Sequence, residues 1–341
     1  MEKPKGKKSQ NILMSVITLV AIIVGAVFFY QPIDETTQKE TLSRPSSELI
    51  FNNDKTQTAE PPGKERAAPT EETPGGSPPE QVYGAEQELP GELVVTFVNV
   101  GQGDSILIQQ AENAILIDSG EYSQREELTE TLQKCGVTAL DYVIVTHPHA
   151  DHMGCMSVII NNFDVRHVLM PDVTATTVSF ERMLQAIDAK NLEIESPEPG
   201  EYIEAGNIRL QILAPNGDDY KDVNNYSIIT RMIWGESEFI FTGDAEELSE
   251  KEVLLTEFDV SADVLKVGHH GSVSSTGEEF LAAVDPDMAV ISCGADNSYG
   301  HPHVETMDKL NAAQIVVYRT DTMGTITMRS NGNEITVSTE K

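Results

Sequence analysis

The chain has 341 residues, 39% of them hydrophobic, and a formal net charge of −32. A surface this acidic repels polyphosphate backbones and excludes a general nucleic-acid binder with a long basic groove. It does not exclude chemistry at a small, local site.

The first 30 residues change composition sharply. Residues 1–10 are basic, whereas residues 11–30 (NILMSVITLVAIIVGAVFFY) contain no charged side chain. A helix over 11–30, at about 1.5 Å per residue, is long enough to cross a bilayer core, so we expect a single transmembrane anchor. The basic tail would stay in the cytoplasm and the rest of the chain would lie outside the cell. A cleaved signal peptide, giving a secreted protein, is the alternative.

Residues 31–90 are rich in Pro, Glu, Thr, Ser and Gly and poor in apolar residues. Such a segment cannot bury enough surface to offset the entropy of ordering, which predicts a disordered linker. It would hold the remaining part, residues 91–341, away from the membrane.

Residues 91–341 alternate between short apolar runs and amphipathic segments, as a globular α/β domain does. We predict strands at 93–99, 105–109, 114–118, 141–145, 208–213, 226–234, 238–242, 263–267, 288–292, 315–318, 324–329 and 334–338. We predict helices at 124–135, 153–161, 177–190, 276–284 and 304–311. This order indicates two sheets packed face to face with helices outside. The turn VGQGDS, residues 100–105, is expected to be an exposed tip.

The stretch THPHADHMG, residues 146–154, holds His147, His149, Asp151 and His152 between a buried strand and a helix. Residues two apart, such as His147 and His149, can clasp one ion, while Asp151 and His152 turn toward a second. Imidazole suits zinc, and added carboxylate also admits manganese or iron. The stretch therefore predicts a site for divalent metal.

Further polar side chains follow other predicted strands. All eight histidines except His167 fall in three loops that follow strands, which indicates one composite site. We expect Asp118 to orient a neighbouring loop and Asp244 to bridge two metals. Of the adjacent pair His269 and His270, one is expected to bind metal and the other to face substrate, with His269 favoured as the ligand.

The motifs HPHADH, the preceding Asp118, the GD at Asp244 and the following GHHGS resemble the metallo-β-lactamase superfamily, whose fold is an αββα sandwich. More narrowly, FVNVGQGDSILI, DVLKVGHHGSVSST and ISCGADNSYGHPH look like the hydrolase domain of ComEC-type competence proteins and their stand-alone relatives. The resemblance covers about residues 93–337.

The resemblance implies one or two divalent metals, Zn or Mn. His147 and His149 would hold the first, Asp151 and His152 the second, and Asp244 would bridge them, with His269 or His270 completing the second site. The superfamily's third histidine of the first site has no counterpart here, and Asn224 and Asn225 stand where it is expected. A more oxygen-rich first site makes manganese a real alternative to zinc.

These residues predict a membrane-tethered, extracellular phosphodiesterase or nuclease that uses a metal-bridging hydroxide. Its substrate would be DNA or a phosphodiester of the cell envelope. His301, His303 and the spare member of the His269/His270 pair are candidates to bind phosphate or protonate the leaving oxygen. A β-lactam or lactone hydrolase on the same site and a non-catalytic binding protein are the alternatives.

Overall fold

The computed structural model describes residue 89 and residues 91–341. The predicted basic tail, the predicted anchor at 11–30 and the predicted linker lie outside the described residues. Within the described part of the chain, no helix is both long enough and apolar enough to span a bilayer.

The first sheet has eight strands in the order β15-β14-β1-β2-β3-β4-β5-β6. These strands are β1 (Leu93–Phe97), β2 (Ile106–Gln110), β3 (Asn113–Ile117), β4 (Ala139–Ile144), β5 (Asp164–Leu169), β6 (Ile194–Glu195), β14 (Ile326–Ser330) and β15 (Ile335–Thr339). Pairing is antiparallel from β15 to β3 and parallel from β3 to β6. The loop that holds His147 and His149 follows β4, which belongs to the parallel half of this sheet.

The second sheet has seven strands in the order β13-β12-β11-β10-β9-β8-β7. They are β7 (Tyr202–Ala205), β8 (Ile208–Ala214), β9 (Ile229–Trp234), β10 (Ser237–Phe241), β11 (Val264–Lys266), β12 (Met288–Ile291) and β13 (Val316–Arg319). Pairing is antiparallel from β7 to β10 and parallel from β10 to β13. Each sheet therefore combines a meander with a parallel half.

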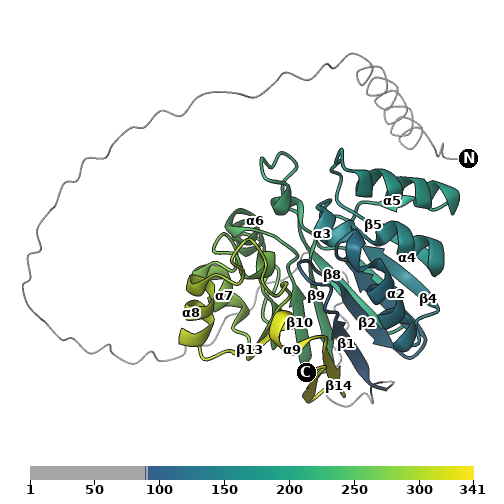
Figure 1. Cartoon of the computed structure of the whole chain (residues 1–341). Helices are drawn as coiled ribbons and strands as arrows, with labels where there is room; N and C mark the ends of the chain where they lie inside the picture. The colour runs from purple at the N-terminus through teal and green to yellow at the C-terminus, as the bar shows by residue number, and fades with distance from the viewer. Residues whose placement is uncertain (1–88, 90) are drawn as a thin grey trace, which may run out of the picture. The chain divides into compact units, whose positions relative to one another are not determined.

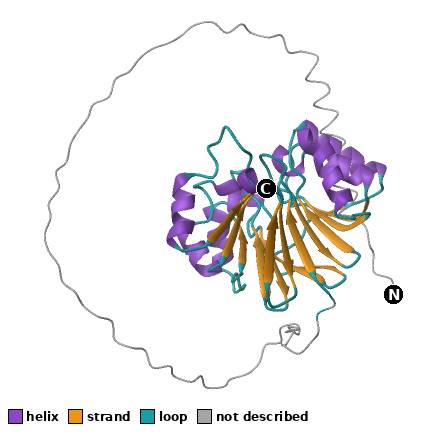
Figure 2. Cartoon of the chain, turned by 60° about the horizontal axis from the view of Figure 1, so that its bottom comes forward, coloured by secondary structure: helices purple, strands orange, loops and turns teal. Residues whose placement is uncertain are grey.

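Helices cover the outer faces of both sheets (Figures 1 and 2). The helices that follow first-sheet strands are α2 (Arg125–Lys134), α3 (Ala150–Met153), α4 (Met156–Asn162) and α5 (Val178–Ala189). Those of the second half are α6 (Glu247–Leu254), α7 (Glu278–Val284), α8 (Val304–Ala312) and the short α9 (Thr320–Met323). Single 3-10 turns lie at η2 (Tyr122–Gln124), η3 (Val223–Tyr226) and η4 (Gly268–Gly271).

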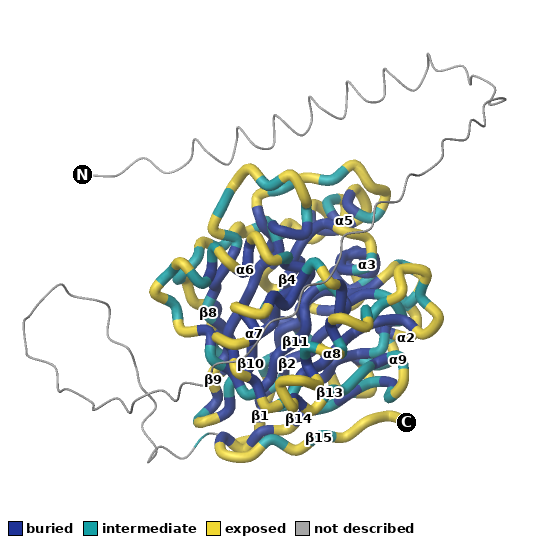
Figure 3. The backbone as a smooth tube through the Cα atoms, turned by 90° about the vertical axis from the view of Figure 1, so that its left-hand side faces the viewer, coloured by how far each residue is buried: buried dark blue, intermediate teal, exposed yellow. Residues whose placement is uncertain are grey.

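Apolar side chains form three packed layers. One lies between the sheets and contains the buried Phe97, Phe239 and Phe241. The other two lie between each sheet and its helices, with Leu128 of α2 in one and Phe280 of α7 in the other. Figure 3 shows these buried strands as a continuous interior. The predicted αββα sandwich is confirmed.

The arrangement of the parallel strands decides where the functional loops lie. The carboxyl ends of neighbouring parallel strands reach the same edge of a sheet. The loops after β4, β10 and β11 carry His147, Asp244 and His270, and these side chains approach one another across the two sheets.

Several local predictions differ from the structure. The turn VGQGDS is not an exposed tip, because its Asp104 is 1% exposed and forms an ion pair inside the fold. The strand predicted from residue 226 begins only at Ile229, because residue 226 still belongs to η3. The helix predicted at 153–161 corresponds to α4, which follows the separate short helix α3. Strands β6 and β7 were not predicted, since both are short and partly exposed edge strands.

Truncating Leu210 tests the packing between the sheets. This side chain is fully buried in the layer between the sheets, whereas Leu255 is 87% exposed. We expect Leu210→Ala to lower the free energy of unfolding by about 2–5 kcal/mol, because it removes buried methyl groups and leaves a cavity. The same change at Leu255 should alter it by no more than about 0.5 kcal/mol. Denaturant unfolding of both variants measures this, and equal losses would contradict the packing described.

Candidate metal centre

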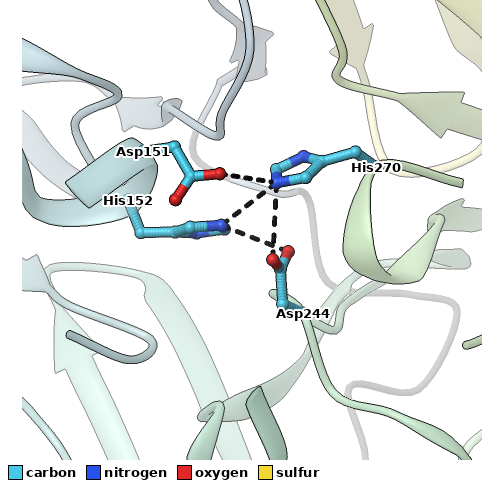
Figure 4. A group of neighbouring side chains, drawn as sticks. All are labelled: Asp151, His152, Asp244 and His270. Carbon is cyan, nitrogen blue, oxygen red and sulfur yellow. Dashed lines mark hydrogen bonds and ion pairs between the residues drawn. The ribbon is translucent and has the colours of Figure 1, made fainter. Parts of the chain in front are cut away.

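Four side chains converge at the edge where the two sheets meet. Asp151, His152, Asp244 and His270 each offer one ligand atom, and these atoms lie within 4.8 Å of one another. Figure 4 shows them pointing toward a common centre from three loops. His152, Asp244 and His270 are buried, and Asp151 forms the more open side.

The backbone places these groups by short connections. Strand β4 is followed by the loop that holds His147 and His149, and α3 then turns Asp151 and His152 inward. In η4, His269 and His270 both have left-handed backbone conformations, with φ of 46° and 55°. Non-glycine residues rarely adopt this region, and such strain is concentrated at functional sites. The two rings consequently face different surroundings.

In both buried imidazoles, His152 and His270, the Nδ1 nitrogen forms a hydrogen bond on the side away from the centre. His270 Nδ1 lies 2.9 Å from the carbonyl oxygen of Ser292, which can only accept, so Nδ1 carries the proton. His152 Nδ1 lies 2.7 Å from Oδ2 of Asp118 and donates to it in the same way. In the neutral rings, both Nε2 atoms therefore present lone pairs to the centre.

These lone pairs meet each other and carboxylate oxygens. His152 Nε2 lies 3.3 Å from His270 Nε2 and 3.2 Å from Oδ1 of Asp244. His270 Nε2 lies 3.2 Å from Oδ2 of Asp151 and 3.4 Å from Oδ2 of Asp244. With both rings neutral, these contacts are between acceptors only, which is unfavourable without a positive charge among them.

The pKa values of these side chains show the same need for a positive charge at the centre. Burial opposes the charged forms of His152 and His270, but the neighbouring carboxylates, Asp244 first, outweigh it and raise both pKa values well above the usual range. Burial also disfavours ionised Asp244, yet His152 and His270 hold its pKa well below the usual range. A divalent cation would supply the positive charge that protons otherwise bring.

The donor set fits such a cation. Asp244 Oδ1 is buried without a hydrogen-bond partner, although it faces His152. Two imidazole nitrogens with carboxylate oxygens are a ligand set used by zinc and also by manganese and iron. His152, His270, Asp244 and Asp151 would therefore hold a divalent metal.

The other two histidines of the HPHADH loop lie beside this group. His147 is buried, with Nε2 3.0 Å from His149 Nδ1 and 3.9 Å from Oδ2 of Asp244. Burial first, then the neighbouring His152, lowers the pKa of His147 well below the usual range, so its ring is neutral. Asp244 thus has Oδ1 toward His152, while its Oδ2 lies near both His270 and His147.

The sequence matches a known family at these residues. The family described as the Metallo-beta-lactamase superfamily matches residues 98–295, more than half of the chain. The chain belongs to the metallo-beta-lactamase superfamily. Its class is therefore that of metal-dependent hydrolases, and the αββα sandwich and the ligand-rich edge are those of the superfamily.

Three curated proteins illustrate the relationship. ComE operon protein 3 of Bacillus subtilis is 34% identical over 71% of this chain and 33% of its own length. Recombination protein 2 of Haemophilus influenzae is 30% identical over 68% of this chain and 28% of its own length. Ribonuclease Z of Methanopyrus kandleri is 26% identical over 48% of this chain and 60% of its own length. The chain spans about a third of the length of the first two.

The adjacent histidines after β11, His269 and His270, lie differently from the arrangement that the sequence analysis favours. His270 belongs to the converging group, whereas His269 Nε2 lies 3.7 Å from Oδ2 of Asp244 and its Nδ1 lies 3.2 Å from Ser274 Oγ. Geometry thus favours His270 as the ligand and His269 as the residue beside it, the reverse of the prediction. The left-handed turn of η4 causes this exchange.

Asn224 and Asn225, which the sequence analysis expects in place of the superfamily's third histidine, differ from each other in their contacts. Asn225 is committed to α6, accepting from the Ser249 N–H and donating to Glu246. Asn224 approaches His269, with Nδ2 3.4 Å from its Nδ1, and its Oδ1 is buried without a partner. Of the two, Asn224 retains a free oxygen for a ligand role.

Asp118 holds the ligand loop in place. Its Oδ1 accepts from the Thr146 N–H at 2.8 Å, and its Oδ2 accepts from the Thr146 hydroxyl and from His152. Burial raises its pKa despite these partners. Asp118 therefore contacts His152 and the ligand loop from behind and is not one of the four converging groups.

Two supporting residues escaped the sequence analysis. Asp104 and Lys266 are both buried and form an ion pair of 2.7 Å. The other carboxylate oxygen of Asp104 lies 3.4 Å from His270 Nδ1, and Lys266 also donates to the carbonyl of Val267. Lys266 lowers the pKa of Asp104 against the effect of burial. In the sequence, the sign of this ion pair is Lys266, a charged residue inside the otherwise apolar strand β11.

Replacing Asp118 tests whether it orients a metal-binding histidine. Asp118→Asn weakens the contact that directs His152, so we expect metal affinity to fall about 10- to 100-fold, the usual effect of such outer partners. Competition with a chromophoric chelator measures it. Asp141→Asn, a control at a buried carboxylate bonded to Arg166 and Ala114, should leave affinity unchanged. Equal affinities for both variants and the parent would contradict this role.

Proposed function

We propose that this chain is a membrane-tethered, extracellular phosphodiesterase or nuclease that depends on divalent metal, zinc or manganese. The observation that carries the proposal is the buried group of imidazole nitrogens and carboxylates, bordered by His147 and His149. A divalent metal bound there supplies a water of lowered pKa and offsets negative charge on a substrate. His152, His270, Asp244 and Asp151 are the proposed ligands, with His147 and His149 on the other side of Asp244.

His303 is placed to hold a proton at a defined atom. Its Nδ1 accepts from the Val273 N–H at 3.0 Å, and a backbone N–H can only donate. Neutral His303 therefore carries its proton on Nε2. This N–H can donate a hydrogen bond to a phosphate oxygen. To protonate the oxygen that leaves, His303 must first become imidazolium, in which Nδ1 also carries a proton and gives up the contact with Val273.

His301 adds a neutral polar edge beside the centre. Its ring centroid lies 6.1 Å from that of His270 and 4.8 Å from that of His303. Burial first, then the neighbouring His270 and His269, lowers its pKa to about 4, and its Nδ1 is buried without a partner. A neutral ring with an unused nitrogen suits hydrogen bonding to substrate oxygens.

The names of the relatives agree with a nucleic-acid or phosphodiester substrate. The names Ribonuclease Z and Recombination protein 2 point toward nucleic acid. The charge of −32 argues against a long duplex groove and favours short or single-stranded segments at the centre. Residues 11–30, which lie outside the described part, are the proposed tether, and a secreted protein is the alternative.

A β-lactam or lactone hydrolase uses the same superfamily site, and a binding protein could retain it without turnover. Against the first stands the oxygen-rich first site, where Asn224 and Asn225 occupy the place expected for the superfamily's third histidine. Against the second stand the four converging ligand atoms of Asp151, His152, Asp244 and His270.

Substrate turnover separates these activities. With added manganese or zinc, we expect the purified chain to hydrolyse bis-p-nitrophenyl phosphate and single-stranded DNA and to leave nitrocefin intact. Asp151→Ala should lower phosphodiester turnover at least about 100-fold, because it removes a ligand of the centre. His167→Ala, at an exposed histidine paired with Glu195, is the control and should match the parent. Turnover of nitrocefin alone would overturn the proposal.

Removing His303 tests its part in proton donation. His303→Ala should lower kcat about 100- to 10,000-fold on a dinucleotide, whose leaving alkoxide needs a proton. The same variant should change kcat little on bis-p-nitrophenyl phosphate, because p-nitrophenolate leaves without one. Equal losses on both substrates would show that His303 does not act as the acid.

A further inference from the structure

Tyr299 is an exposed aromatic residue beside the metal centre. It is 66% exposed, and its ring lies against that of His301 with centroids 5.7 Å apart and an angle of 20° between the planes. His301 in turn contacts the rings of His269 and His270. Tyr299 is therefore separated from the proposed ligand His270 by a single ring.

The loop that carries Tyr299 is held by side-chain hydrogen bonds. Asn297 Oδ1 accepts from the N–H groups of Tyr299 and His301 at 3.1 and 3.0 Å. Its Nδ2 donates to the carbonyls of Gly294 and His301 at 2.9 and 2.6 Å. The Tyr299 ring thus stands on an organised support while most of its surface faces water.

Two apolar side chains beside His303 are also exposed, and we call these two together with Tyr299, His301 and His303 the rim. Val273, whose N–H binds His303, is 48% exposed, and Val304, the next residue after His303, is 70% exposed. Exposed apolar side chains gathered around a polar centre are typical of a binding surface. The rim therefore offers an exposed aromatic face at Tyr299 and exposed apolar side chains beside His303, next to groups suited to phosphate.

We propose that Tyr299 is a stacking platform for an unpaired nucleobase of the nucleotide whose phosphodiester occupies the metal centre. The proposal rests on the proposed phosphodiesterase function and specifies its substrate as single-stranded nucleic acid. Bases stack on exposed aromatic rings without regard to sequence. Because the protein is strongly acidic, it cannot rely on a basic groove, and stacking provides affinity that does not depend on positive charge.

The place of Tyr299 relative to the metal centre follows from the order of the neighbouring rings. His301 lies between Tyr299 and His270, and His303 lies beside His301, so a phosphate near these histidines has its own or the neighbouring base within reach of the tyrosine ring. A duplex would keep that base paired and unavailable. The arrangement therefore selects strands with free bases.

Dinucleotides with and without bases test this directly. The substrates are thymidylyl-thymidine and three analogues in which a tetrahydrofuran abasic residue replaces the 5′ nucleoside, the 3′ nucleoside or both. We expect the parent to cleave thymidylyl-thymidine with kcat/KM about 10- to 100-fold above the doubly abasic analogue, mostly through KM. One singly abasic analogue should lose most of this advantage, which identifies the stacked base.

Two variants make the test specific to the ring. Tyr299→Phe keeps the aromatic face and should match the parent on every substrate. Tyr299→Ala should cleave thymidylyl-thymidine about 10- to 100-fold less efficiently in kcat/KM but should equal the parent on the doubly abasic analogue.

The outcomes distinguish this inference from the function on which it rests. If the parent cleaves all four substrates equally, or if Tyr299→Ala loses the same factor on each, the stacking platform is refuted while the phosphodiesterase function stands. If the parent cleaves none of them and also fails on bis-p-nitrophenyl phosphate, the proposed function itself falls.

Discussion

The convergence of imidazole nitrogens and carboxylate oxygens at one buried point governs the rest of the site. His152 and His270 are each fixed through Nδ1, so their Nε2 atoms must face each other and Asp244. Such a group is unfavourable in a low-dielectric interior unless a positive charge lies within it. The raised pKa values of both histidines express this need, and a divalent cation satisfies it with the ligands already in place.

Residues that contact the proposed ligands from behind hold this arrangement in place. Asp118 connects β3 to the ligand loop, and the buried Asp104–Lys266 pair lies behind His270. Removing one member of a buried ion pair leaves an unpaired charge, so Lys266 and Asp104 depend on each other. The parallel halves of the two sheets bring these loops to one edge, and a packed apolar core lies between the sheets.

Much of this could be predicted from the sequence, and the exceptions have physical causes. β-Branched runs indicated most strands, and the HPHADH loop with Asp118 and Asp244 indicated the site, because these signals are local. The exchange of His269 and His270 depends on two left-handed backbone conformations, which residue type alone does not predict. The burial of Asp104 depends on Lys266, a partner distant in the chain, so its turn resembled an exposed loop.

A crystal structure of the manganese-loaded protein with an anomalous difference map tests the proposed metal centre most directly. We predict an anomalous peak among His152, His270, Asp244 and Asp151, with the Nδ1 contacts to Asp118 and Ser292 preserved. A second peak on the His147 side of Asp244 is compatible with a two-metal centre. A fully loaded crystal with no peak among the four residues, or with its peaks elsewhere, would contradict it.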